Sequence, residues 1–275
     1  MNMNEAAKQI VQFILKWLAK IYIAKTKPYI IVVAGTTRRV WIKEAIERAL
    51  RERNFLVRTN QKHFNAEIGI PLSILNLPSG EGDVKKWGAI LWQATKKALD
   101  FRKKALNPEK TEHLILEMAI DTPMDMAYLL SIVRPNMVVM TTITMIYQEH
   151  FETLDNIGRE FEALAAALPW NGILALNADD ARISGMKDAY KGKVVTYGFA
   201  ENAQFKAVDP RRTETGEEFR FEVQRKELES YRKKINRFGQ HHIYAELVRE
   251  IVLDNFKAQP KEFFNRMAKG LLGHE

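Results

Sequence analysis

The residue types best suited to binding a phosphate occur together in one short stretch: Gly35, Thr36, Thr37, Arg38 and Arg39. An apolar run at 30–33 precedes them and a helical pattern follows, which is the usual frame of a phosphate-binding loop, because free N–H groups at a helix N-terminus attract an anion. A working loop reads G-x-x-x-x-G-K-[ST], or G-x-x-G-K-[ST] in a shorter variant. Aligned on Gly35, the shorter pattern puts Arg38 at the second glycine and Arg39 at the lysine. Val40 takes the place of the metal-binding hydroxyl, so the sequence retains only half of a nucleotide site.

The elements that must position this loop alternate along the chain. Short apolar runs predict strands at 30–33, 55–58, 113–118, 137–142, 172–177 and 193–197. Apolar residues at helical spacing predict helices at 42–49, 84–106, 125–133, 155–168 and 181–190, and residues 63–72 predict a loop. This alternation indicates an α/β fold with a doubly wound, mostly parallel sheet. Strands at 204–208 and 218–223 predict a small antiparallel extension, and helices at 242–255 and 260–272 close the chain.

Residues 5–24 predict an N-terminal amphipathic helix. Lys8, Lys16 and Lys20 interrupt its apolar residues, so it is too polar to span a membrane. We therefore divide the chain into a helix at 1–27 and a domain at 28–275. Two interpretations of the helix stay open. It packs on the domain behind it, or it makes peripheral contact with a membrane surface, as basic helices with Trp and Phe do.

The composition narrows the function classes. A chain of 275 residues with 46% hydrophobic residues can bury a sizeable core. It has no cysteine, which excludes disulfides and thiolate metal sites. A net charge of +8 favours anionic partners. The basic residues are mixed with acidic ones, however, and no nucleic-acid-binding motif occurs. We therefore expect no specific nucleic-acid binding. We expect a cytoplasmic protein, either free or at the inner face of the membrane.

Six segments match one protein family in order and spacing. They are 33–39 (VAGTTRR), 63–71 (HFNAEIGIP), 116–121 (LEMAID), 134–143 (RPNMVVMTTI), 176–180 (LNADD) and 239–242 (GQHH). Together they resemble the central, ATP-binding domain of the Mur ligases, in particular the branch that adds D-alanyl-D-alanine to a cell-wall precursor. The resemblance covers residues 28–256. The family's N-terminal and C-terminal domains have no counterpart in this sequence, so we do not expect a complete ligase.

The resemblance implies cofactors and roles for individual residues. Ligases of this family use ATP and Mg²⁺ to make an acyl phosphate, which an amine then attacks. In the resemblance, Glu117 takes the place of a metal-binding carboxylate. Asn177 and Asp180 lie where the family contacts the nucleotide, and His63 and Asn65 belong to a loop on the substrate side.

Four groups on which the family relies are replaced. Arg39, Val40, Tyr147 and Phe161 stand at the phosphate lysine, the loop hydroxyl, a metal-binding histidine and a bridging lysine. Phosphoryl chemistry needs this charge neutralisation, because the transferred group is strongly anionic. Several of the positions also have a plain structural interpretation: Phe161 fits core packing, and Asp180 fits a helix N-cap. The two loop arginines either grip an anion or are solvated remnants of a decayed loop.

The sequence supports one leading hypothesis and one alternative. The leading hypothesis is a catalytically impaired pseudoenzyme that binds a nucleotide, another anionic ligand or a protein partner in a peptidoglycan context. The alternative is a divergent ATP-dependent ligase that joins an acid to an amino acid or peptide on a cell-wall precursor. ATP and Mg²⁺ are implied by the family, but the replaced residues argue against an ordinary Mg-ATP site.

Overall fold

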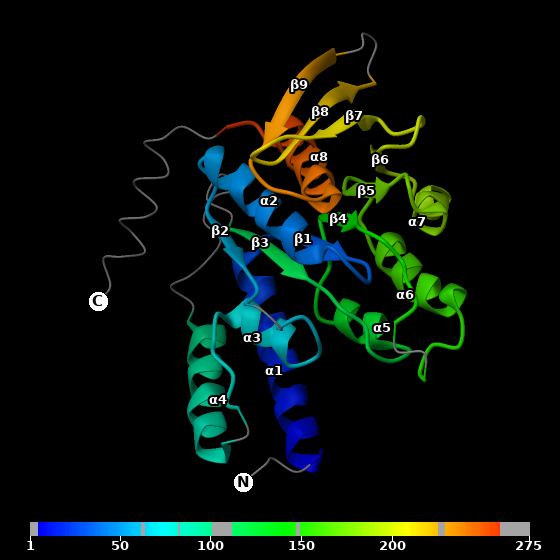
Figure 1. The fold of residues 1–275 in the computed structure, drawn as a ribbon. Coiled ribbons are helices and arrows are strands. Elements are labelled where there is room, and N and C mark those ends of the chain that lie inside the picture. The colour runs from blue at the N-terminus through cyan, green and yellow to red at the C-terminus, as the bar shows by residue number, and fades with distance from the viewer. Residues whose placement is uncertain are drawn as a thin grey trace.

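We analysed a computed structural model, which describes residues 5–61, 64–81, 83–100, 112–146, 149–224 and 229–258. In these residues the strands form one sheet in the order β2-β3-β1-β4-β5-β6-β7-β8-β9 (Figure 1). The strands are β1 (Tyr29–Ala34), β2 (Val57–Thr59), β3 (His113–Glu117), β4 (Met137–Met140), β5 (Ile173–Asn177), β6 (Lys193–Gly198), β7 (Phe205–Arg212), β8 (Glu217–Val223) and β9 (Glu229–Ile235). The helices are α1 (Glu5–Thr26), α2 (Arg39–Glu52), α3 (Gly69–Leu75), α4 (Val84–Leu99), α5 (Asp125–Leu130), α6 (Leu154–Ala166), α7 (Ala181–Gly185), the 3₁₀ helix η2 (Met186–Ala189) and α8 (Gln240–Asn255).

The parallel part of the sheet is built around β1. Strands β1 to β7 all pair in parallel, and β1 lies between β3 and β4. Along β1, Ile30 and Val32 pack into the core on one face, and Ile31 and Val33 pack into the core on the other. A β-branched run that is buried on both faces is what a central parallel strand requires. The predicted α/β fold with a mostly parallel sheet is therefore confirmed.

Helices cover both faces of the sheet. Helices α2 and α8 pack against each other and on one face, while α5 and α6 cover the opposite face (Figure 1). Beyond β7 the sheet continues with β8 and β9, which are antiparallel. The predicted antiparallel extension is therefore present, with one strand more than expected.

Two elements were missed by the sequence analysis. Strand β9 has mostly exposed polar residues and no apolar alternation, because it lies at the edge of the sheet, where charged side chains also prevent pairing with another chain. Helix α3 occupies part of the expected loop at 63–72. Pro71 lies in the first turn of α3, where a missing N–H costs no hydrogen bond, so its turn signal was misleading.

Other predicted boundaries were too long. The helix expected at 84–106 ends at Leu99, because Asp100 has an extended backbone. The helix expected at 181–190 is the short helix α7 followed by η2. The strand expected at 137–142 ends at Met140, after which the chain turns to contact the Gly35 loop. The closing helix at 260–272 lies outside the described residues.

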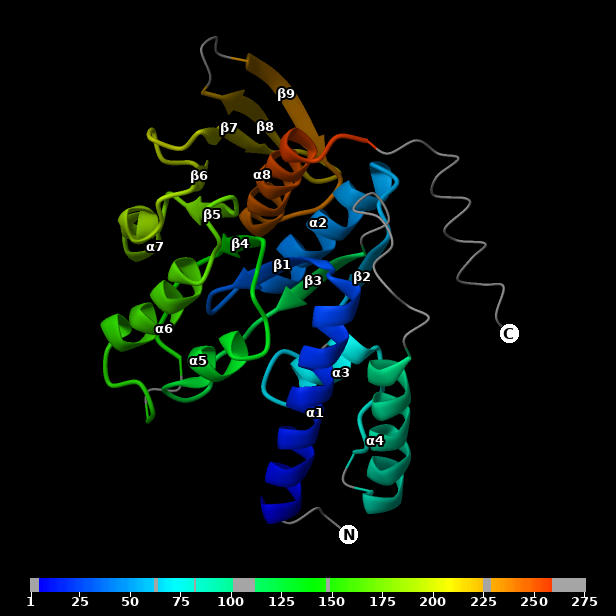
Figure 2. The ribbon, with the colours of Figure 1, turned by 180° about the vertical axis from the view of Figure 1, so that it is seen from behind.

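Helix α1 packs on the protein through one side. Val11, Leu15 and Leu18 are buried in a small core with residues of α3 and α4. Figure 2 shows α1 and α4 side by side, projecting beyond the sheet, with the N-terminal end of α1 far from β1. The interpretation that the helix packs on the domain is thus supported for this side. Among the described helices, none is long and apolar enough to cross a membrane.

Phe161 on α6 allows a test of this core. Its side chain is fully buried on α6. We expect Phe161→Ala to lower the free energy of unfolding by about 3–5 kcal/mol, because the substitution removes buried surface and leaves a cavity. Chemical denaturation measures this change. Glu162→Ala, at the exposed neighbouring position, should change it by less than about 0.5 kcal/mol; an equal effect of the two substitutions would contradict this packing.

Candidate functional site

A cavity of about 480 Å³ lies at the carboxyl ends of the central strands. It is lined by Thr36, Arg39, Asn65, Ala119, Ile120, Asp121 and Ile146. After β1 the chain adds β2 and β3 on one side of β1 and then β4 on the other, so the strand order reverses beside β1. Ligands of open α/β sheets bind at such reversal points, because the loops there diverge and leave a crevice. The cavity therefore lies where the fold favours a ligand.

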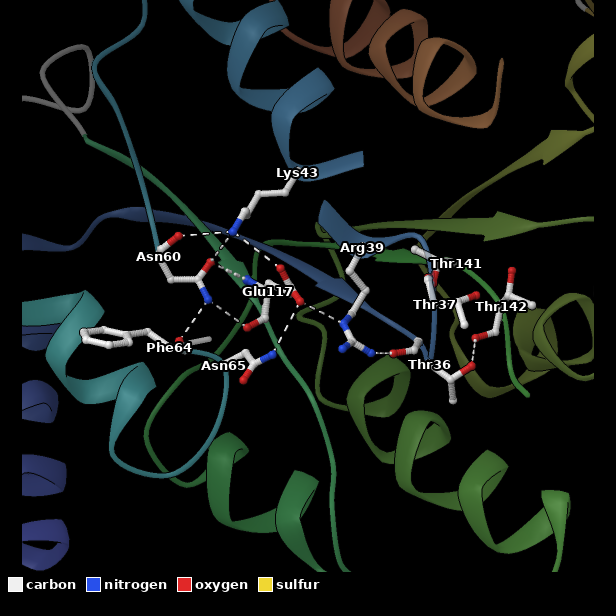
Figure 3. Close-up of polar contacts among 11 residues, drawn as sticks. Thr36, Thr37, Arg39, Lys43, Asn60, Phe64, Asn65, Glu117, Thr141 and Thr142 are labelled. Carbon is white, nitrogen blue, oxygen red and sulfur yellow. Dashed lines mark hydrogen bonds and ion pairs between the residues drawn. The ribbon is translucent and has the colours of Figure 1, made fainter. Parts of the chain in front are cut away.

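The Glu117 carboxylate is the electrostatic centre of this region (Figure 3). Glu117 ends β3 and is 7% exposed. Arg39 donates from Nε to its Oε1 at 3.1 Å, and Lys43 Nζ lies 3.4 Å from its Oε2. Asn65 donates to Oε1 at 3.4 Å. Each carboxylate oxygen therefore faces a positive charge that the chain itself provides.

Lys43 and Asn60 hold this cluster in place, and the sequence analysis missed both. Lys43 is 7% exposed and donates to the backbone carbonyl of Asn60 at 3.1 Å. The Asn60 side chain accepts from the N–H of Glu117 at 2.9 Å and donates to the carbonyls of Glu117 and Phe64 at 3.0 and 2.9 Å. The one available sequence signal was spacing, because Lys43 lies four residues after Arg39 and so on the same face of α2.

The Gly35 loop is fastened to the segment after β4. Gly35 has φ +128°, and a Cβ there would lie 2.2 Å from Thr141 Oγ1, so only glycine fits. Thr36 donates its N–H to the Thr142 carbonyl at 2.8 Å, and its hydroxyl accepts from the N–H of Thr144 at 2.8 Å. Thr141 Oγ1 donates to the Thr37 carbonyl at 2.6 Å. The hydroxyls of Thr36 and Thr141 thus hold the loop against the segment after β4.

The two loop arginines point to different partners. Arg39 also donates to the Gly35 carbonyl and lines the cavity, so it is not a solvated remnant. Arg38 has φ +66°, a left-handed conformation that favours the glycine of the motif and costs other residues about 1–2 kcal/mol. Its guanidinium lies over the Tyr244 ring, 4.8 Å from the centroid.

Beside Arg38, α8 contributes an aromatic cluster. Tyr244 donates to Asp179 at 2.7 Å, and burial together with this carboxylate raises the pKa of Tyr244. The His241 ring packs against the Trp41 ring at a tilt of 39°, with ring centroids 4.1 Å apart. Burial and the positive charge of Arg38 lower the pKa of His241 below its ordinary value of 6.5. Both effects favour the neutral form of the imidazole, which lies beside the guanidinium of Arg38.

The nucleotide-side residues expected from the sequence have structural partners. Asn177 is buried and donates to the Thr141 carbonyl at 2.6 Å. Asp180 caps α7 by accepting from the N–H groups of Arg182 and Ile183, and it accepts from Ile143 N at 2.8 Å. These contacts join β5 and α7 to the segment that holds the Gly35 loop.

The remaining expected residues are not all brought together. Asn65 reaches Glu117, but His63 and Tyr147 lie outside the described residues. Close to Tyr147 in the sequence, the side chains of Glu149 and His150 are exposed. Phe161 is buried in the core, in agreement with its structural interpretation.

The residues present do not fit a magnesium ion. Mg²⁺ binds through oxygen ligands in near-octahedral geometry, and in nucleotide sites it is held by carboxylates, hydroxyls and phosphates. Here Val40 offers no hydroxyl, and both oxygens of Glu117 already face cations. Within the described ranges, no group of three His, Cys, Asp or Glu side chains is placed to hold a metal. They do fit an anion, because Arg39 and the N-terminus of α2 lie at the cavity.

The Glu117 cluster predicts a stability effect. Glu117→Gln keeps the side-chain shape but leaves the buried ammonium of Lys43 with no counter-charge at this position. We expect it to lower the free energy of unfolding by about 3 kcal/mol, since an uncompensated buried charge is strongly destabilising. Adding Lys43→Met should recover part of the loss, which a double-mutant cycle measures. The exposed control Glu149→Gln should cost less than about 0.5 kcal/mol, and an equally small effect of Glu117→Gln would contradict the cluster.

Known proteins with similar sequences include ligases of UDP-N-acetylmuramate and of UDP-N-acetylmuramoyl-tripeptide. A UDP-N-acetylmuramate–L-alanine ligase from Sulfurihydrogenibium is 28% identical over 109 residues, which are 40% of this chain and 21% of that protein. A UDP-N-acetylmuramoyl-tripeptide–D-alanyl-D-alanine ligase from Mycobacterium leprae is 31% identical over 85 residues, 31% of this chain and 16% of that protein. The chain thus matches about a fifth of the length of these relatives.

Solved structures share the fold over most of the chain. MurF from Acinetobacter baumannii superposes with a TM-score of 0.67 at 13% identity, covering 93% of this chain and 48% of that one. MurF ligase from Thermotoga maritima, in complex with ADP, gives a TM-score of 0.67 at 19% identity, covering 92% and 50%. This chain therefore spans about half the length of these neighbours.

A family model describes the same relationship directly. The model of the Mur ligase middle domain matches residues 86–248, which is more than half of the chain. The match includes Glu117, Asn177 and Asp180 and confirms the resemblance derived from the sequence. The chain belongs to the Mur ligase family and carries its middle domain.

Proposed function

We propose that this protein is a Mur-ligase-like pseudoenzyme that binds an anionic ligand without magnesium. The observation that carries the proposal is the ion pairing of Glu117 with Arg39 and Lys43. A carboxylate that coordinates a metal needs an oxygen lone pair directed at the ion and a net negative charge near it. Here two cations from α2 already neutralise that charge, so the carboxylate attracts a magnesium ion only weakly at this position.

The replaced lysine, hydroxyl and metal ligands bear on catalysis, because the reaction of the family depends on charge neutralisation. Formation of an acyl phosphate from ATP develops charge on the phosphoryl oxygens, which a lysine and Mg²⁺ normally stabilise. In this chain Arg39 stands at the lysine but is turned toward Glu117 and the Gly35 carbonyl. Arginine is also a planar fork and does not replace the compact ammonium of lysine. The cations of this site therefore act mainly on the protein's own carboxylate.

The best-supported ligand is a nucleotide or another phosphate-bearing molecule. Arg39, Thr36 and Asn65 line the cavity together with the start of α2, whose first N–H groups have no partner inside the helix. One structural neighbour is a complex with ADP. Since the relatives are named as ligases of UDP-N-acetylmuramate and of UDP-N-acetylmuramoyl-tripeptide, we propose that the ligand or a protein partner belongs to peptidoglycan synthesis. A cytoplasmic location, with membrane contact through residues 5–24, belongs to the same proposal.

A divergent ATP-dependent ligase is the second candidate. The observation in its favour is that the cavity, the Gly35 loop and Glu117 keep their places at the carboxyl edge of the sheet. An incoming phosphate that displaced Arg39 from Glu117 would free the carboxylate for a metal. The reaction would then join an acid and an amino acid or peptide on a cell-wall precursor.

Calorimetry with ATP separates the two functions. We expect ATP to bind with the same affinity with and without Mg²⁺ and to remain unhydrolysed. Arg39→Ala should weaken binding by about tenfold, because a hydrogen bond to a charged group contributes about 1.5–3 kcal/mol. Arg48→Ala is the matched control, since it removes the same charge from an exposed position on α2.

Two results would contradict the pseudoenzyme proposal. The first is a large gain in ATP affinity on addition of Mg²⁺. The second is release of phosphate by the unmodified protein, abolished by Glu117→Gln. Either result would favour the divergent ligase, and thermal unfolding of each variant shows whether a loss of binding reflects a loss of fold.

A further inference from the structure

Most of the net positive charge of the chain comes from two neighbouring helices. Helices α1 and α4 pack against each other and project beyond the sheet (Figure 2). Each contains four lysines, and Glu5 is the one acidic residue in their combined sequence. They account for +7 of the net charge of +8. The rest of the chain is therefore almost neutral, although the net charge of the whole chain does not show this.

The same helices expose large apolar side chains. On α1, an exposed stripe follows the helical spacing of three or four residues and consists of Ile10, Phe13, Trp17 and Ile21. Phe13 is 63% exposed and Trp17 is 48% exposed. On α4, Trp92 is 71% exposed and Leu99 is also exposed. These side chains are additional to Val11, Leu15 and Leu18, which already pack in the core between the helices.

Aromatic and basic groups are interleaved on α1. The rings of Phe13 and Trp17 meet edge to face with centroids 6.3 Å apart. The ammonium of Lys20 lies over the Trp17 ring, 4.6 Å from its centroid. Such a side chain can lay its stem along an apolar surface while its charge stays in the polar layer above. This is the arrangement of helices that lie in the interface of an anionic bilayer.

We propose that α1 and α4 form one binding surface for a bilayer that contains anionic phospholipid. Phe13, Trp17 and Trp92 enter the headgroup region, and exposed lysines such as Lys85, Lys86 and Lys96 attract the lipid phosphates. The inference rests on the membrane-contact part of the proposed function, extends it to a second helix and names the lipid charge. It does not depend on what the Glu117 cavity binds.

The charge distribution favours lipid over a second copy of the chain. Two copies that met through these helices would bring eight lysines on each side together with one acidic residue each. Like charges at such an interface repel, whereas an anionic bilayer supplies the opposite charge. The attraction to lipid is also electrostatic in part, so it must weaken as salt shortens the screening length.

Vesicle co-sedimentation tests the surface with the full chain. We expect binding to vesicles of phosphatidylcholine with phosphatidylglycerol and little binding to phosphatidylcholine alone. Raising the salt from about 0.1 M to about 1 M should release most of the protein, because the screening length falls from about 10 Å to about 3 Å. The combined variant Phe13→Ala, Trp17→Ala and Trp92→Ala should bind at least tenfold more weakly. Trp170→Ala is the matched control, because Trp170 is 85% exposed outside these helices.

A second variant tests the lysines. Lys85→Gln, Lys86→Gln and Lys96→Gln together should reduce binding by about 100-fold, since each basic residue near an anionic surface accounts for about fivefold. The control carries the same loss of charge elsewhere, at Lys187, Lys191 and Lys257, which are exposed. These six positions are on the surface, so circular dichroism should be unchanged in both variants.

Several results would overturn the proposal. They are absence of binding to either vesicle, equal binding to both, or equal losses in the variants and their controls. A dimer in sedimentation equilibrium that dissociates in the combined Phe13, Trp17 and Trp92 variant would assign the surface to a second copy. Calorimetry with ATP on the same variants separates the two proposals, because lost lipid binding with unchanged ATP binding leaves the Glu117 site intact.

Discussion

The interaction on which this site depends is the burial of one carboxylate between two cations. Glu117 leaves water at the end of β3, and a buried charge is stable only when it is paired and hydrogen-bonded. Arg39 and Lys43 provide that pairing from successive turns of α2. The carboxylate therefore ties the first turns of α2 to the sheet. The same pairing removes the negative charge that would attract a divalent cation.

The surrounding contacts make this arrangement rigid. Asn60 binds the backbone of Glu117 on both its N–H and its carbonyl, and it holds the carbonyl of Phe64 as well. On the other side of β1, Thr36 binds the segment after β4. The cavity thus lies between two loops that are each fixed to a neighbouring strand. A ligand at this cavity meets a prepared pocket, in which Arg39 is the nearest positive side chain.

The strand, turn and helix that frame the site could be predicted from the local sequence. The ion pairs and hydrogen bonds around Glu117 could not. An apolar β-branched run before Gly35 is sufficient to indicate a strand, a turn and a helix, and Glu117 was expected at a strand end for the same reason. The role of Lys43 depends on how α2 is rotated against β3, which no local pattern records. Asn60 follows a strand of three residues whose register is visible only in the folded sheet. The left-handed backbone of Arg38 is likewise a feature of the folded loop that the residue type does not predict.

An experimental structure of the protein soaked with ADP and Mn²⁺ tests the central claim most directly, because the anomalous signal of manganese locates the metal without ambiguity. Our account predicts no manganese at Glu117 and an Arg39 guanidinium that remains within hydrogen-bonding distance of its carboxylate. Nucleotide density in the cavity, with or without metal on the phosphates alone, agrees with that account. Manganese bonded to Glu117, with Arg39 displaced toward the phosphates, would contradict it and would show that the metal site of a ligase is still functional.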